Sequence, residues 1–345
     1  TEFITLTRAI DKKWIHPEGF SPFDASPINW VGDQKHTWGS SGEDNMGAGN
    51  DDLVRETDEG IELAIESILQ SAELGYSLVG SDIAGFSGGE IPANLYIRWA
   101  QFSTFCGLFL NGGHGERRLW KRSQEELEVI RKFTWLHKEL IPYMYHYVVM
   151  AHSGEKLLQK AMDKGRYQYM FGDDFLIAPI CEDSKIREVV LPEGKWRYFF
   201  DDKKVIAGGT YKREYPLDEF PVYLKEGAII PMDIQRNYMQ MGDSTSAGFT
   251  TILVYPEDKN KFHYYHTDLI GETVISYEEK ENSLLLKLEG TKIPHILRIH
   301  STSSPTDVKL DGQIISEGKW QFDEEKLKLI IRIQTYKEGN YEIQF

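Results

Sequence analysis

Four polar side chains each follow a short apolar segment, and together they could bind a sugar and move a proton. They are Arg8, Asp33, Asp82 and His114, which follow residues 3–7, 28–32, 76–79 and 108–110. In an α/β protein the carboxyl ends of parallel strands meet at one rim, so we expect these side chains to lie near each other. Carboxylates, imidazoles and guanidinium groups hydrogen-bond to hydroxyls, and two carboxylates across a glycosidic bond can hydrolyse it.

Each of these residues also has a structural interpretation. Arg8 and Asp82 could form an internal ion pair, His114 could be a hydrogen-bonded loop histidine, and Asp33 could cap the turn that follows it. The agreement of four successive segments favours a site that binds a neutral, polyhydroxylated ligand. On residues alone, Asp33 and Asp82 are the candidate catalytic pair.

Aromatic residues accompany the two aspartates. Trp30 precedes Asp33, and Phe86 follows Asp82; their rings offer faces for the apolar side of a sugar. We expect the Asp33 carboxyl to be partly buried beside Trp30. Partial burial raises the pKa of a carboxyl and suits it to donate a proton near neutral pH.

Helical patterns separate these segments. Apolar residues between 61 and 72 recur at i, i+3, i+4, i+7, i+8 and i+11, a second helix is predicted over residues 92–105, and Ser123 with Glu126 forms a capping box for a third. About four strand–helix units thus occupy the first 150 residues. We expect the second half of an eight-stranded (β/α)8 TIM barrel, with an open doubly wound sheet as the alternative.

From about residue 170 the pattern changes to short apolar runs between Gly, Pro and Asp turns, and Asp311–Gly312 predicts a hairpin. We therefore predict two β-sandwich domains after the half-barrel. The expected domains are residues 1–165, 166–255 and 256–345.

Composition narrows the function classes. Of 345 residues, 39 are Lys or Arg and 54 are Asp or Glu, so the formal net charge is −15. Such a surface repels phosphate backbones and anionic lipid, which argues against nucleic-acid and membrane partners. No metal-ligand spacing, phosphate loop or dinucleotide motif is present, and we expect no metal or other cofactor. Two cysteines are too few for a disulfide framework and indicate no compartment.

Seven motifs in order resemble glycoside hydrolase family 31, the α-glucosidase and α-xylosidase group. They are Leu6-Thr7-Arg8, Trp30-Val31-Gly32-Asp33, Ser81-Asp82-Ile83-Ala84-Gly85-Phe86, Arg98-Trp99 with the Phe109-to-Gly115 loop, Phe171-Gly172-Asp173-Asp174-Phe175-Leu176-Ile177-Ala178-Pro179, Val190-Leu191-Pro192-Glu193-Gly194-Lys195-Trp196 and Glu226-Gly227-Ala228-Ile229-Ile230-Pro231.

The resemblance implies a retaining α-glycosidase in which Asp33 is the general acid/base. It places Arg8, Trp30, Asp82, Phe86 and His114 around the sugar, and it removes Asp82 from the nucleophile role. The family's nucleophile is an Asp on barrel strand four, which is expected upstream of Thr1. The chain is therefore expected to be a C-terminal portion, inactive alone, whose N-terminal remainder completes the barrel around an oligosaccharide or glycoside substrate.

Some residues depart from the family pattern. The chain has an insertion over residues 14–27, reads Asn111-Gly112-Gly113 before His114, and carries Gln34 after Asp33. These changes leave an N-acetylhexosamine, galactose or sulfosugar as alternatives to glucose or xylose. A non-catalytic carbohydrate-binding fragment is the alternative of a different class.

Overall fold

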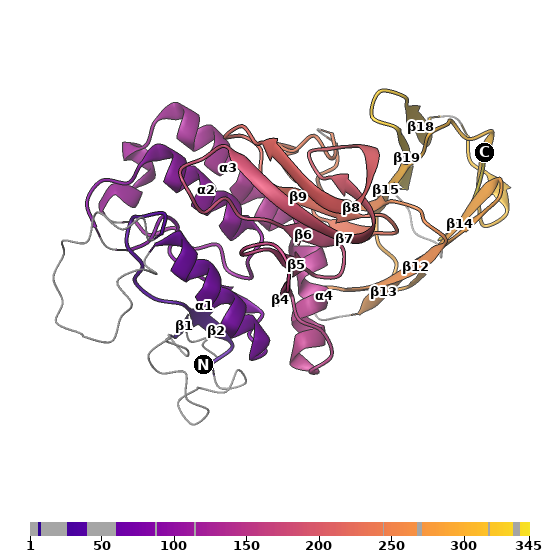
Figure 1. Cartoon of the computed structure of the whole chain (residues 1–345). Helices are drawn as coiled ribbons and strands as arrows, with labels where there is room; N and C mark the ends of the chain where they lie inside the picture. Colours follow the sequence, from indigo (N-terminus) through magenta and orange to yellow (C-terminus); the bar gives the residue numbers. More distant parts are fainter. Residues whose placement is uncertain are drawn as a thin grey trace. The chain divides into compact units, whose positions relative to one another are not determined.

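The computed structural model describes residues 6–7, 26–39, 60–86, 88–113, 115–243, 245–267, 271–316, 318–333 and 339–345. Contacts divide the chain into two compact units, and each is described by itself. Unit 1 comprises Thr1–His137, Met150–Leu191 and Gly209–Val222, and unit 2 comprises Lys138–Val149, Pro192–Gly208 and Tyr223–Phe345. Figure 1 traces the elements along the chain.

Unit 1 opens with a parallel sheet in the order β1-β2-β3. Its strands are β1 (Leu6–Thr7), β2 (Ile28–Trp30) and β3 (Leu78–Gly80). The predicted strand 108–110 is reduced to a single parallel bridge between Asp82 and Leu110. Backbone hydrogen bonds from Leu108 to Val79 and from Ile83 to Leu110 still align this segment with the sheet. The predicted order of four parallel segments is confirmed, although the fourth is too short to form a strand.

Two helices connect these segments. Helix α1 (Ile61–Glu73) follows β2, and α2 (Ala93–Thr104) follows β3. The apolar stripe predicted for α1 is buried, and the helix ends before Gly75, whose φ is 98°. A positive φ favours glycine, which explains why the helix stops here.

A buried arginine fixes α2 against a distant loop of the same unit. Arg98 donates hydrogen bonds to the carbonyl oxygens of Glu219 (2.6 Å) and Tyr215 (2.5 Å) and to Gln101 Oε1 (2.9 Å). Gln101 donates in turn to the carbonyl oxygen of Leu217 at 2.6 Å. Arg98 and Gln101 thereby satisfy the buried carbonyl groups of this loop and fix its course.

The predicted capping box is present. The backbone N–H of Ser123 donates to Glu126 Oε2 (2.9 Å), and the N–H of Glu126 donates to Ser123 Oγ (3.3 Å). These bonds satisfy free N–H groups where the third helix begins. The 3-10 helices η2 (Gly115–Arg117) and η3 (Leu119–Lys121) precede α3 (Gln124–Glu139). Helix α4 (Ile141–His152) follows, with Pro142 in its first turn.

A six-stranded sheet follows in the order β4-β5-β6-β9-β7-β8. Its strands are β4 (Gln159–Ala161), β5 (Tyr169–Phe171), β6 (Phe175–Ile177), β7 (Ile186–Tyr198), β8 (Asp201–Glu214) and β9 (Val222–Lys225). The apolar residues 189–191 and 196–198 lie in one strand, β7, which continues through Pro192 and through Gly194, whose φ is 130°. The pattern did not indicate β8, since none of its residues is buried and no apolar face alternates along it.

Unit 2 contains two further sheets. One has the order β10-β11-β15-β19-β18 and the other β12-β13-β14-β20-β16-β17. The first consists of β10 (Ile229–Met232), β11 (Thr250–Val254), β15 (His295–His300), β18 (Trp320–Asp323) and β19 (Lys328–Ile333). The second consists of β12 (Lys259–Tyr265), β13 (Glu272–Lys280), β14 (Ser283–Gly290), β16 (Asp307–Leu310), β17 (Gln313–Ile314) and β20 (Gly339–Gln344).

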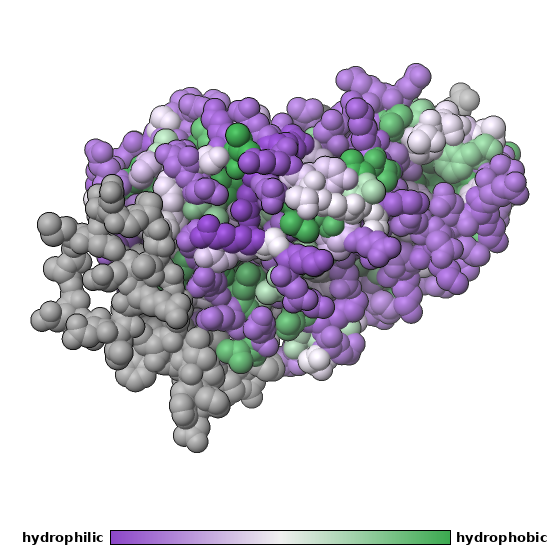
Figure 2. Space-filling view, in the orientation of Figure 1, coloured by the Kyte–Doolittle hydropathy of each residue, from purple (hydrophilic) through white to green (hydrophobic). Residues whose placement is uncertain are grey.

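The predicted hairpin joins β16 and β17. Asp311 and Gly312 have φ values of 52° and 76°, the pair of positive angles that a type I′ turn requires. On the face drawn in Figure 2, hydrophilic residues cover most of the described surface, with apolar residues between them. This distribution accords with the large excess of acidic side chains in the sequence.

Candidate functional site

The site is built where β2, β3 and the Leu110 segment end, all within unit 1. Because the strands are parallel, the residues that follow β2 and β3 leave the sheet at the same edge. The backbone N–H of Val31 donates to the carbonyl oxygen of Gly80 at 3.1 Å and extends this register by one residue. The loops that carry Asp33 and Asp82 thus start side by side.

Asp82 is the most constrained carboxylate of the rim. Its side chain is buried, Trp30 Nε1 donates to its Oδ2 at 2.8 Å, and Arg117 Nη1 donates to its Oδ1. Arg117 is buried as well, so the two charges compensate each other in a poorly solvated place. Both carboxylate oxygens are therefore held in fixed positions.

A turn after Asp82 joins the two loops. Ala84 and Gly85 have φ values of 64° and 82°, and the Gly85 N–H donates to the Asp82 carbonyl oxygen at 3.0 Å. A Cβ on Gly85 would lie 2.7 Å from the carbonyl oxygens of Gln34 and Lys35, so only glycine fits between the loops. The Phe86 N–H then donates to the Gln34 carbonyl oxygen at 2.8 Å.

His36 contributes a further link between the loops. Its Nδ1 lies 2.6 Å from the carbonyl oxygen of Ala84. A carbonyl oxygen can only accept, so this ring nitrogen carries the proton. The loop after β2 is thereby bonded to the loop after β3 by side-chain and backbone groups together.

Two aromatic rings and a guanidinium pack beside Asp82. The Arg117 guanidinium lies 4.8 Å from the centroid of the Phe86 ring, and the rings of Trp30 and Phe86 meet edge to face at 6.4 Å. Phe86 remains 40% exposed, so part of its ring is open to solvent. An exposed ring beside a fixed carboxylate can contact the apolar and the hydroxylated parts of one sugar.

Asp33 differs from the expectation, because the residue is exposed and not partly buried. The next residue, Gln34, is buried and donates from Nε2 to the Val31 carbonyl oxygen at 3.0 Å. With Gln34 anchored inward, the loop presents its neighbour Asp33 to solvent. The burial that the sequence suggested for the Asp33 carboxyl is therefore absent from the described structure.

Arg117 was not expected from the sequence to pair with Asp82, and the structure shows an ion pair between them. The suggested pair of Arg8 with Asp82 is not tested, because Arg8 lies outside the described residues. Gly112 makes room for Arg117, because a Cβ there would lie 2.4 Å from the Arg117 guanidinium carbon. The consecutive arginines Arg117 and Arg118, which follow Asn111-Gly112-Gly113, were the feature of the sequence that could have indicated a cation at the rim. Arg8 and His114 lie outside the described residues, and their roles stay predictions.

Comparison with known protein families identifies the family of this chain. Residues 39–147 match the glycosyl hydrolases family 31 TIM-barrel domain, and residues 142–230 match the glycosyl hydrolase family 31 C-terminal domain. The two adjoining matches together cover more than half of the chain. It belongs to glycosyl hydrolase family 31. The predicted resemblance is thus confirmed.

Individual relatives cover most of this family 31 chain. An isomaltosyltransferase of Sporosarcina globispora is 25% identical in an alignment that covers 85% of the chain and 28% of the relative. Alpha-glucosidase 2 of Bacillus thermoamyloliquefaciens is 24% identical in an alignment that covers 91% of the chain and 40% of the relative. The cycloalternan-forming enzyme of Listeria monocytogenes, solved with a pentasaccharide substrate, superposes with a TM-score of 0.76 at 23% identity, covering 92% of this chain and 32% of that one. The chain thus spans about a third of the length of these proteins.

The described structure contains neither a metal cluster nor a membrane-spanning helix. Within the described ranges no three His, Cys, Asp or Glu side chains converge as metal ligands would. No helix of that part of the chain has the length and apolar character needed to cross a membrane.

Proposed function

We propose that this family 31 chain carries the acid/base side of a retaining α-glycosidase active site, with Asp33 as the proton donor. The observation that carries the proposal is the rim: Asp33 is exposed in a loop that starts beside the loop of Asp82, whose two carboxylate oxygens accept bonds from Trp30 and Arg117. Family membership and the names of the relatives, an α-glucosidase and an isomaltosyltransferase, support α-linked sugars as substrates.

The hydrogen bonds divide the roles of the two aspartates. A retaining enzyme needs a nucleophilic carboxylate about 5–5.5 Å from the acid, with an oxygen open to the anomeric carbon. Both oxygens of Asp82 accept bonds from Trp30 and Arg117, which makes it a poor nucleophile and a well-oriented acceptor for a sugar hydroxyl. We therefore assign Asp82 to substrate binding and the nucleophile to an Asp outside residues 1–345.

In this mechanism Asp33 first protonates the glycosidic oxygen while the nucleophile attacks the anomeric carbon. The same side chain, now a carboxylate, then removes a proton from water, which hydrolyses the covalent intermediate. A sugar hydroxyl in place of that water would give transfer, the reaction named for the Sporosarcina relative. Trp30 and Phe86 are assigned to the apolar face of the sugar, and Arg8 and His114 to its hydroxyls.

The domain assignment belongs to the same proposal. Residues 1–165 form the second half of the (β/α)8 barrel, residues 166–255 a proximal β-sandwich and residues 256–345 a distal one. The consecutive parallel pairing of β1, β2 and β3, with helices between the later segments, supports the first assignment. Further chain of the same protein completes the barrel, and residues 1–345 alone are expected to lack glycosidase turnover.

The decisive experiment replaces Asp33 by Asn in the complete enzyme. Loss of the acid slows the first step strongly for substrates with poor leaving groups and spares aryl glycosides with activated leaving groups, because these depart without protonation. Asp163→Asn is the matched control, since Asp163 is exposed in a turn of the same unit and lies outside the rim. Pre-steady-state rates on a disaccharide and a dinitrophenyl glycoside separate the two effects.

Two results would contradict the assignment. Equal loss on both substrates would remove the acid role from Asp33, and turnover by the purified 345-residue chain would remove the need for an outside nucleophile. A panel of α-glucosides, α-xylosides, α-galactosides, N-acetylhexosaminides and sulfoquinovosides identifies the sugar. Binding without turnover of every member by the complete protein would favour the non-catalytic alternative.

A further inference from the structure

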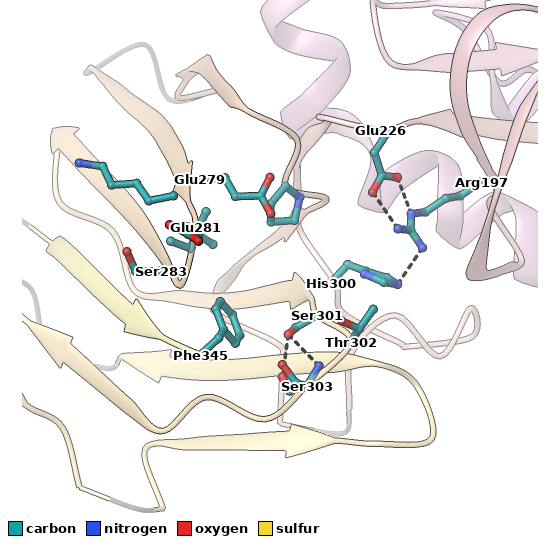
Figure 3. Close-up of a pocket in the computed structure, with 13 residues that line it drawn as sticks. Arg197, Glu226, Glu279, Glu281, Ser283, His300, Ser301, Thr302, Ser303 and Phe345 are labelled. Atoms are coloured by element: carbon teal, nitrogen blue, oxygen red, sulfur yellow. Dashed lines mark hydrogen bonds and ion pairs between the residues drawn. The ribbon is translucent and has the colours of Figure 1, made fainter.

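A polar cavity lies in unit 2, and none of the residues that line it belongs to the rim. Its volume is about 300 Å³, the lower end of the range for small-molecule sites. Figure 3 shows that its walls come from the β13–β14 turn, the segment after β15, the residue after β20, and the positions of Arg197 and Glu226. All of these segments belong to unit 2, so the cavity is a property of that unit alone.

Buried charged groups form one side of the cavity and are held rigidly. Arg197 donates from Nε to Glu226 Oε2 at 2.5 Å and from Nη2 to Oε1 at 2.7 Å. Its Nη1 donates to the Asp202 carbonyl oxygen and to His300 Nε2, each at 2.7 Å. Both Arg197 and His300 are more than nine-tenths buried. This side of the cavity is therefore lined by fixed polar groups, in which the charges of Arg197 and Glu226 compensate each other.

His300 is neutral in this arrangement. Burial, followed by the nearby Lys328 and Arg197 cations, lowers its pKa to about 3. Its Nε2 accepts the bond from Arg197, so the proton of the ring sits on Nδ1. The buried side of the cavity therefore adds no further positive charge at neutral pH.

The remaining walls offer hydroxyls, carboxylates and one ring. Ser301 accepts a bond from the Ser303 N–H at 3.3 Å and donates to the Ser303 carbonyl oxygen at 2.6 Å, which fixes this turn. Glu279 and Glu281 come from the β13–β14 hairpin, on another side of the cavity in Figure 3. Phe345 contributes its ring to the wall of the cavity. The site thus combines acceptors, donors and an aromatic surface.

The charge balance selects the ligand class. Three carboxylates (Glu226, Glu279 and Glu281) face two cations (Arg197 and Lys280), which disfavours a phosphate or another anion. A metal ion is equally unsupported, because the carboxylates do not converge into a metal-binding group in the described structure. Acceptors, hydroxyls and a ring around a cavity of this size suit a neutral, polyhydroxylated molecule.

We propose that this cavity is a second carbohydrate-binding site, which holds one or two units of a neutral α-linked oligosaccharide in the C-terminal β unit. The α-linkage rests on the proposed function; the polyhydroxylated class rests on the cavity alone. Glu281 accepts hydrogen bonds from sugar hydroxyls, and the Phe345 ring packs against the apolar face of the sugar. Such a site retains a polymeric substrate on the protein between catalytic events and raises its effective concentration.

The test is calorimetric titration of the purified 345-residue chain with maltotriose and with isomaltotriose. Glu281→Gln is expected to weaken binding about tenfold, the effect of losing one charge-assisted hydrogen bond. Thr302→Trp, which fills the cavity, is expected to abolish it. Glu289→Gln is the matched control, because Glu289 is an exposed carboxylate of β14 that does not line the cavity.

Phe86→Ala separates this site from the rim. A roughly tenfold weakening in E281Q and loss of binding in T302W, with unchanged binding in E289Q, supports the proposal. Loss in F86A with unchanged E281Q and T302W would place the sugar at the rim and overturn the inference while leaving the proposed function intact. Absence of binding by the unmodified chain would also overturn it. If the complete enzyme hydrolyses no α-glycoside, the proposed function fails, and cavity-dependent binding still stands by itself.

Discussion

Replacement of Arg117 by Met should destabilise the rim more than any other single change there. The side chains of Arg117 and Asp82 are 2% and 7% exposed, so the variant leaves a buried carboxylate with Trp30 as its remaining described partner. Removing one member of a buried ion pair costs about 3–5 kcal/mol. Loss of the contact with Phe86 adds about 0.5–1 kcal/mol, because that ring is partly exposed. Together these contributions amount to about 3.5–6 kcal/mol, and we expect a loss of at least about 4 kcal/mol.

Hydrogen exchange followed by mass spectrometry measures this effect locally. A chain of two units need not unfold in one step, so a global free energy of unfolding would mix their contributions. Peptides covering residues 78–86 contain the amide of Ile83, which bonds to Leu110, and that of Phe86, which bonds to Gln34. A loss of 4 kcal/mol in local opening free energy accelerates their exchange by up to roughly a thousandfold. Peptides from β13 and β14 serve as the internal reference.

Two further variants test whether the Arg117–Asp82 ion pair stabilises the rim. Arg118→Met removes the adjacent arginine, which bonds to the Gly115 carbonyl oxygen and packs over Trp120, and should cost less than about 1 kcal/mol. Adding Asp82→Asn to R117M removes the stranded charge and should restore about 2 kcal/mol. If residues 78–86 exchange no faster in R117M than in R118M, or if D82N gives no rescue, the ion pair does not hold the rim together.

Two other changes test the rim and the cavity of unit 2. Gly112→Ala should accelerate exchange of residues 78–86 by about tenfold to a hundredfold because its Cβ displaces the Arg117 guanidinium, whereas Gly113→Ala, with open space around its Cβ, should leave exchange unchanged; equal effects would contradict this account. For His300, whose pKa falls from 6.5 to about 3, the unfolded chain binds a proton between these pH values that the folded protein does not, so stability should decrease as pH falls through this window. His300→Gln retains an acceptor for Arg197 but cannot titrate, and urea titrations at pH 7 and 4.5 should show a smaller decrease than in the parent chain; an identical decrease would exclude His300 as the cause.

The elements that were predicted correctly are those with a one-sided burial pattern. The stripe of α1 is apolar because one face of the helix packs in unit 1, and the capping box at Ser123 is a local pattern of side chain and backbone. β8 escaped detection because a strand with no buried face carries no alternation. The reduction of 108–110 to a bridge at Leu110 depends on contacts across the sheet, which sequence patterns do not contain.

The sequence predicted which residues lie together in the candidate site, but not which of them bond to each other. Trp30, Asp82 and Phe86 do meet, as expected from their positions after neighbouring parallel strands. The bond between Arg117 and Asp82 could not be inferred, because the neighbouring Arg117 and Arg118 have equal charge. In the fold, the guanidinium of Arg117 occupies the space that a Cβ on Gly112 would fill. Positions after strands identify which residues share a rim, whereas packing decides which of them bond.

The two aspartates illustrate why packing also decides chemistry. Asp33 and Asp82 stand in similar contexts, each shortly after a strand and close to small and aromatic residues. In the fold, inward anchoring of Gln34 leaves Asp33 exposed, while Trp30 and Arg117 take one oxygen of Asp82 each. A proton donor must exchange protons with substrate and water in every cycle, whereas a fixed acceptor gains from being immobile. The difference in accessibility therefore agrees with the proposed roles, in which Asp33 transfers the proton and Asp82 orients a hydroxyl.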